Sequence, residues 1–295
     1  MSKVVVEYPG TCGELFQGIL EDIPCLVSCP IDKKVRLEVS LCRGPSMMML
    51  PAGMEKTRRS LEEAVRRFGL SSFFITVRKK NPLPEGRGYA SSTADILGAL
   101  YGLAELSGYS LTPEEATSIA VSVEPTDSLA WPGLALLDHR EGRMMRMLGC
   151  PPPMDVLVID SGGFVDTEEF NRRDILPVLR RHAGLYEEAC SMLSRGISEG
   201  DVSAIGRASA MSALASSSFL PKDGLKEILE IGRSFGSPGI CTAHSGTLVG
   251  VLLDPSSEDG WGGLVGALRK FLPEGTTIAH HRIVSGGPIF PGGGL

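Results

Sequence analysis

The chain has 295 residues, of which 42% are hydrophobic and 22% charged, and its formal net charge is -6. This composition is typical of a soluble globular protein long enough for two domains that share a cleft, and it offers no apolar run that would span a bilayer. The acidic balance and the lack of a Lys/Arg stripe disfavour nucleic-acid binding, which depends on neutralising phosphates.

The N-terminal sequence and the cysteines indicate a reducing, intracellular setting. The first residues, MSKVVVEYPGTCGELFQG, lack the apolar core and cleavage site of a secretory signal. The seven cysteines contain no CxxC pair, and an odd number argues against a complete disulfide framework. We therefore expect reduced thiols and a cytoplasmic protein.

The first half of the chain combines strand and helix patterns. Alternation with a period of two indicates half-buried strands, and apolar residues near a 3.6-residue period indicate helices. Thr112 is predicted to cap a helix that has Pro113 at its first position. In chain order the predicted elements are a strand at 4–6, a turn at Pro9-Gly10, a strand at 34–41, a helix at 61–68, a strand at 73–79, a helix at 92–106 and a helix from Pro113 to Pro125.

A proline-rich segment, Cys150-Pro151-Pro152-Pro153, predicts a stiff connector between two domains, residues 1–150 and residues 151–295. The patterns that follow it are those of an α+β domain. They predict a strand at 154–160, helices at about 168–196, 201–218 and 222–235, a strand at 247–253, a helix at 262–271 and a strand at 276–284.

A glycine-rich segment, PLPEGRGYASSTAD at 82–95, leads into the predicted helix at 92–106. Free backbone N–H groups and the positive end of the helix dipole converge there, which favours an anion. Gly86 and Gly88 permit close backbone approach, and hydroxyl groups come from Ser91, Ser92 and Thr93. The segment is neither a Walker A loop nor a dinucleotide fingerprint. A phosphate cradle and an ordinary helix cap with glycine turns are the two interpretations.

Three motifs, in this order along the chain, resemble those of the GHMP kinases (galactokinase, homoserine kinase, mevalonate kinase and phosphomevalonate kinase). PGTCGELFQG at 9–18, with PID at 30–32, is similar to the family's N-terminal substrate motif. PEGRGYASSTA at 84–94 resembles its phosphate-binding motif, and CTAHSGTLVG at 241–250 its C-terminal glycine-containing motif. The sequences of these motifs and of EPTD at 124–127 are most similar to those of the L-threonine kinases of cobalamin biosynthesis.

The resemblance implies an α+β fold of two domains. The N-terminal domain would be of the ribosomal protein S5 domain 2-like type and the C-terminal domain ferredoxin-like, with ATP, Mg²⁺ and the acceptor in the cleft between them. It further implies that a small hydroxyl-bearing metabolite, L-threonine, is converted to O-phospho-L-threonine for the aminopropanol linker of cobalamin. A homodimer is compatible with it.

The resemblance also implies which residues bind the nucleotide and the metal. The expected nucleotide-binding residues are Pro84, Gly86, Arg87, Gly88, Ala90, Ser91, Ser92 and Thr93. Ser92 and Glu124 are the expected magnesium ligands, with a solvated helix-terminal carboxylate as the alternative for Glu124. Many relatives carry a lysine where this chain has Thr11, so Arg87 becomes the candidate phosphate-binding cation, unless it is an ordinary exposed arginine.

Three further residues are candidates for binding the acceptor or for catalysis on its hydroxyl group. Asp127 is expected to accept or orient the hydroxyl proton, or otherwise to hold a local turn. Glu14 is expected to bind the ammonium of an amino acid or to order its own loop, and His244 to touch nucleotide or substrate, or only Ser245. The competing functions are another GHMP kinase, acting on homoserine or a hydroxy acid, and a nucleotide-dependent sensor that has lost catalysis.

Overall fold

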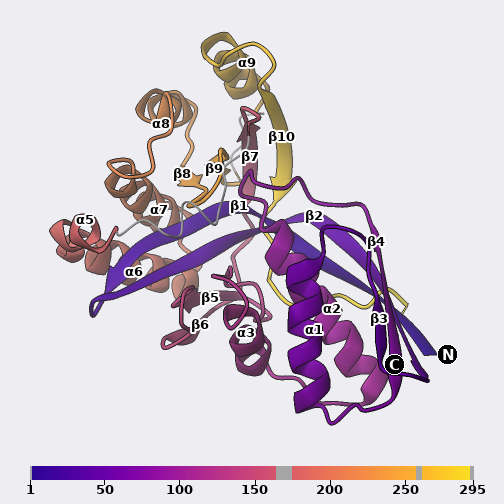
Figure 1. The fold of residues 1–295 in the computed structure, drawn as a ribbon. Helices are drawn as coiled ribbons and strands as arrows, with labels where there is room; N and C mark the ends of the chain where they lie inside the picture. Colours follow the sequence, from indigo (N-terminus) through magenta and orange to yellow (C-terminus); the bar gives the residue numbers. More distant parts are fainter. Residues whose placement is uncertain (1, 164–174, 257–260, 293–295) are drawn as a thin grey trace.

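The computed structural model describes residues 2–163, 175–256 and 261–292, and Figure 1 shows the chain folded around one long, curved sheet. The strands are β1 (Ser2–Leu20), β2 (Ile23–Arg43), β3 (Met47–Met49), β4 (Phe73–Lys80), β5 (Leu134–Leu137), β6 (Met145–Gly149), β7 (Asp155–Asp160), β8 (Gly239–Thr242), β9 (Val249–Leu253) and β10 (Thr277–Arg282). The helices are α1 (Glu55–Arg67), α2 (Ser91–Ser107), α3 (Pro113–Val121), α5 (Leu176–Arg181), α6 (Ala183–Glu199), α7 (Val202–Ser216), α8 (Leu225–Ser234) and α9 (Gly262–Phe271).

The sheet has the strand order β10-β7-β9-β8-β1-β2-β4-β3, and β5 pairs with both β2 and β6. Its centre is the antiparallel β1–β2 hairpin, whose strands cross the middle of the molecule in Figure 1. On one side β2 pairs with β4, and on the other β1 pairs with β8 through Glu14 and Thr242. The hairpin therefore connects elements from the two halves of the sequence.

The predicted turn at Pro9-Gly10 is wrong, because β1 runs through both residues. The strand absorbs the proline through a register shift between Pro9 and Gly10, and a further irregularity lies between Thr11 and Glu14. Proline lacks the N–H that a regular ladder needs, and a bulge accommodates it without ending the strand. These irregularities lie in the N-terminal motif.

Helix α2 packs against the hairpin through two glycines. A Cβ on Gly98 would lie 3.0 Å from Leu37 Cδ1, and one on Gly102 would lie 2.6 Å from Val39 Cγ2, so glycine permits the close approach of the helix to the sheet at both positions. The prediction of a helix here is confirmed. The capping box of Thr112 and Glu115 confirms the predicted start of α3, but α3 ends at Val121 rather than at Pro125.

Helices α6 and α7 cover the part of the sheet formed by β1 and β8. Ser212 on α7 accepts a hydrogen bond from the backbone N–H of Gln17 and donates one to the Gln17 carbonyl, both at 2.8 Å. The helix predicted at 168–196 is divided into α5 and α6 at His182, and its residues 168–174 lie outside the described residues. The short strands β3, β5, β6 and β8 were not predicted.

The main hydrophobic core contains residues from both sides of residue 150. Phe16 and Leu97 belong to it, and so do Val156 and Tyr186. The proline-rich segment lies between β6 and β7, and a domain boundary there stays a prediction. Within the described ranges, every helix is too short or too polar to cross a membrane.

Candidate active site

The N-terminal end of α2 opens into a cleft. Ala90 precedes the helix with a φ of 55°, in the left-handed region, and no described side chain caps the first turn. The N–H groups of that turn therefore remain donors for a ligand. Six of the eight expected nucleotide residues line the cleft: Gly86, Gly88, Ala90, Ser91, Ser92 and Thr93.

The glycine-rich loop is held by the other two motifs. Thr11 donates its hydroxyl hydrogen to the Gly88 carbonyl at 2.9 Å, and the backbone N–H of Thr247 donates to the Arg87 carbonyl at 2.8 Å. Gly88 has a φ of +105°, and a Cβ there would lie 2.3 Å from Ala243 Cβ. The three motifs thus fix one another at the cleft, and the loop requires glycine for both conformation and space.

The side chain of Arg87 pairs with Asp160. Its guanidinium donates to Asp160 Oδ2 at 3.0 Å, and the Tyr89 hydroxyl donates to the same oxygen at 3.4 Å. Neither Arg87 nor Pro84 is among the described residues that line the cleft. Arg87 therefore connects the loop to the end of β7, and its role as a phosphate-binding cation stays a prediction.

Ser92 and Glu124 meet at the start of α2. The Ser92 hydroxyl donates to Glu124 Oε1, and Lys56 Nζ donates to Glu124 Oε2 at 2.7 Å. The Glu124 side chain is only 13% exposed, so the interpretation as a freely solvated carboxylate does not describe it. Two hard oxygens beside free N–H donors suit magnesium, which prefers a few oxygen ligands and keeps waters.

Lys56 is a cleft residue that the sequence interpretation missed. It lies in the first turn of α1 and contacts a carboxylate 68 residues away. In the sequence, Lys56 is one of several basic residues on an amphipathic helix. No local pattern marks it as a cleft residue. Its ammonium brings a cation to the cleft.

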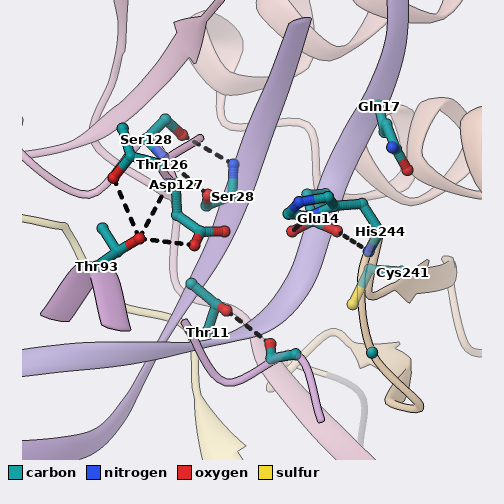
Figure 2. Close-up of polar contacts among 12 residues, drawn as sticks. Thr11, Glu14, Gln17, Ser28, Thr93, Thr126, Asp127, Ser128, Cys241 and His244 are labelled. Carbon is teal, nitrogen blue, oxygen red and sulfur yellow. Dashed lines mark hydrogen bonds and ion pairs between the residues drawn. The ribbon is translucent and has the colours of Figure 1, made fainter. Parts of the chain in front are cut away.

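Asp127 lies in the loop after α3 and is fixed from two sides. The Thr93 hydroxyl donates to Asp127 Oδ2 at 3.0 Å and accepts from the Asp127 N–H at 3.2 Å. The next residue, Ser128, exchanges hydrogen bonds with Ser28 on β2 at 2.9 and 3.0 Å. Figure 2 shows the Asp127 carboxylate directed toward Glu14 and His244.

Burial raises the pKa of Asp127 to about 6, even though the nearby His244 lowers it. The Glu14 carboxylate adds to the rise, and the Thr93 hydrogen bond opposes it. A carboxylate with a pKa near neutrality accepts a proton more readily than an ordinary surface aspartate does. This environment suits a general base.

Glu14 and His244 join β1 to the C-terminal motif. Glu14 accepts from the His244 backbone N–H at 2.7 Å and contacts its ring Nδ1 at 2.8 Å. Burial by itself lowers the pKa of His244, but the carboxylates of Glu14 and Asp127 outweigh that effect and raise it. Glu14 therefore orders the motif and keeps a positive charge beside Asp127.

Ligand atoms of Glu14, Asp127 and His244 lie within 4.8 Å of one another, which makes them a second set able to hold a metal. One of these three ligands, however, is a nitrogen. Magnesium favours an all-oxygen shell. The pair of Ser92 and Glu124 is the better match for this ion.

A further ion pair borders the cleft at Asp95, which sequence reasoning gave no role. Lys79 Nζ on β4 donates to Asp95 Oδ2 at 2.5 Å, while Asp95 Oδ1 is buried without a described partner. Burial raises the pKa of Asp95 to about 6, and Lys79 opposes this rise. The pair attaches α2 to the sheet beside the phosphate loop.

Comparisons with known proteins show which family the chain is similar to. A family model, that of the GHMP kinases N terminal domain, matches residues 55–130. The chain is 30% identical over 258 residues to the L-threonine kinase of Salmonella typhimurium, covering 86% of this chain and 84% of that one. It is 31% identical over 263 residues to the L-threonine kinase of Citrobacter freundii, covering 86% and 88%.

Among solved structures, the homoserine kinase from Cytophaga hutchinsonii matches with a TM-score of 0.73. The match covers 98% of this chain and 97% of that one at 16% identity, so it shows the fold alone. The expected mixed fold of helices and strands is confirmed by this likeness.

Proposed function

The chain belongs to the GHMP kinase family, and we propose that it is an ATP-dependent L-threonine kinase. The reaction would transfer the γ-phosphoryl group of ATP to the side-chain hydroxyl, giving O-phospho-L-threonine for the aminopropanol linker of cobalamin. Because ATP and free amino acids are abundant in the cytoplasm, we place the reaction there. The observation that carries the proposal is that Asp127 faces Glu14 and His244 in the cleft where α2 begins.

The start of α2 would bind the phosphates of ATP. Its uncapped N–H groups and the backbone of Gly86 and Gly88 offer donors, and the helix dipole favours negative charge. Ser92 and Glu124 would hold magnesium, which when bound neutralises phosphate charge. Lys56, already beside Glu124, adds a second cation at the same place.

The other side of the cleft would receive the amino acid. Glu14 would bind its ammonium, and Asp127 would take the proton of its hydroxyl as that oxygen bonds to the γ-phosphorus and ADP leaves. Asp127 is suited to this step by its raised pKa and by Thr93, which fixes its orientation. His244 stabilises the charged form of Asp127 and so limits the rise of that pKa.

The proposal is tested by an ADP-release assay with magnesium and ATP. L-threonine, L-serine, L-homoserine and 1-amino-2-propanol serve as acceptors, and mass spectrometry identifies the product. We expect the highest kcat/KM with L-threonine and a product heavier by one phosphoryl group. Faster turnover of another alcohol would keep the kinase and replace the acceptor. ATP binding without turnover of any acceptor would identify a sensor.

A further inference from the structure

Lys222 lies beside the C-terminal motif, in the turn between α7 and α8. Its ammonium donates to the carbonyl of Gly246, two residues after His244. Gly246 itself packs against the glycine-rich loop, where a Cβ would lie 2.2 Å from the Arg87 carbonyl. The backbone carbonyl therefore fixes the lysine head group next to the residues of the acceptor side.

The charge of Lys222 is not balanced by a described carboxylate. In the described part of the chain no Asp or Glu lies within ion-pair distance of its ammonium, and the residue is half-buried. Burial lowers the pKa of Lys222 to about 8, and Glu14 opposes this shift. A half-buried cation with only a carbonyl partner is costly for a fold to keep, and a bound anion would relieve the cost.

Glu14 and Lys222 carry opposite charges that act on each other without forming an ion pair. Lys222 likewise lowers the pKa of His244, the ring that contacts Glu14. Two opposite charges held apart in this way match a molecule that carries both signs. The ammonium and carboxylate of an α-amino acid have this complementary arrangement.

We propose that Lys222 binds the α-carboxylate of the acceptor and thereby selects an amino acid over an amino alcohol. This inference rests on the proposed function. Glu14 then binds the ammonium, Lys222 the carboxylate and Asp127 the hydroxyl, so that three contacts define the position of the reacting oxygen. A site built to pair a charged group discriminates strongly against an analogue without it, because the site's own charge is left unpaired.

The test compares L-threonine with L-threoninamide, in which an uncharged carboxamide replaces the carboxylate. Both are assayed at pH 7, where Lys222 is charged because its pKa is about 8. The proteins are the wild type, Lys222→Met, Lys222→Arg and Lys226→Met, the last removing an exposed lysine of α8. If the amide is not turned over, its inhibition constant against L-threonine replaces its KM.

We expect Lys222→Met to raise KM for L-threonine about ten- to a hundredfold, as for loss of a charged hydrogen bond, with kcat little changed. The amide constants should stay near those of the wild type, Lys222→Arg should recover part of the loss, and Lys226→Met should match the wild type. Equal losses for both compounds, or no loss for L-threonine, would overturn the inference.

Failure of the proposed function has a different outcome. In that case the wild type would turn over neither compound. Calorimetric binding of L-threonine to the wild type and to Lys222→Met would then decide the inference: weaker binding only in the variant supports it, and equal or undetectable binding in both overturns it.

Discussion

Asp127 holds its proton more tightly than an ordinary aspartate because its carboxylate is partly withdrawn from water beside Glu14. Its pKa of about 6 lies above the ordinary value of 3.8, so below about pH 6 the side chain is increasingly protonated. A protonated carboxyl group cannot accept the hydroxyl proton. The pH dependence of turnover thus reports on this residue.

We predict that kcat/KM falls below about pH 6, and that His244→Asn moves this acidic limb to higher pH. His244 lowers the pKa of Asp127, and its removal lets that pKa rise. pH–rate profiles of both proteins measure the shift. His280→Asn is the control, because His280 is exposed and pairs with Asp155. A limb that stays in place or moves to lower pH in His244→Asn would contradict this electrostatic account.

The same burial predicts that Asp127→Asn stabilises the fold. A raised folded-state pKa penalises folding above it, and this penalty disappears below the unfolded value near 4. The shift from 3.8 to about 6 corresponds to about 2 kcal/mol after allowance for partial exposure. Urea unfolding should show the gain at pH 8 and little at pH 4. Asp223→Asn, at an exposed position, should show none. A pH-independent change would point to altered packing instead.

At the scale of elements, the glycine-rich loop depends on its contact with the C-terminal motif. Gly88→Ala should lower the free energy of unfolding by about 2–4 kcal/mol, because it combines a positive φ with a clash against Ala243. Nucleotide affinity should fall with it. Gly236→Ala is the control, because Gly236 also has a positive φ but has open space around it. This substitution should cost only about 1–2 kcal/mol. Equal losses of unfolding free energy in the two variants would show that close packing against Ala243 does not contribute.

The pairing of α2 with Glu124 predicts a defect that magnesium can rescue. Glu124→Gln keeps the shape of the side chain but removes the charge that would attract the ion. The magnesium concentration for half-maximal activity should rise about tenfold or more, with partial recovery at high magnesium. Glu105→Gln, on the exposed face of α2, is the control. An unchanged magnesium dependence would limit Glu124 to its contacts with Lys56 and Ser92.

Local patterns predicted most of the helices but only parts of the long strands β1 and β2, since periodicity and caps act within a few residues. Thr112 shows this at α3, where the sequence contains the whole capping box. Short strands such as β8 were missed because their four buried residues lack a distinguishing period. The same limit applies to the bulged β1, where pairing on both edges overrides the local turn signal of Pro9-Gly10.

At the scale of the molecule, residues from both halves of the chain share the main core. The β1–β8 pairing at Glu14 and Thr242 also connects them. We therefore expect one cooperative thermal transition, with equal calorimetric and van't Hoff enthalpies. Scanning calorimetry measures both. Two resolved transitions would instead favour independently folding units on either side of residue 150.

The motifs could be predicted because each is a short, contiguous pattern, whereas several contacts among them could not. Lys56 reaches Glu124, and Lys222 reaches Gly246, across tens of residues without any spacing signal. The direction of the Arg87 side chain likewise depends on Asp160, whose position only the folded sheet determines. Sequence reasoning identified candidate groups, and folding decided their partners.

The central claim is that Asp127 enables phosphoryl transfer to L-threonine in this cleft. Its most direct test is single-turnover transfer from γ-labelled ATP to L-threonine by the wild type and Asp127→Asn, with ATP affinity measured in parallel. We predict a loss of rate of about a thousandfold in the variant, within the usual range for general acid–base catalysis, and unchanged ATP affinity. Transfer at an undiminished rate in Asp127→Asn would contradict the claim.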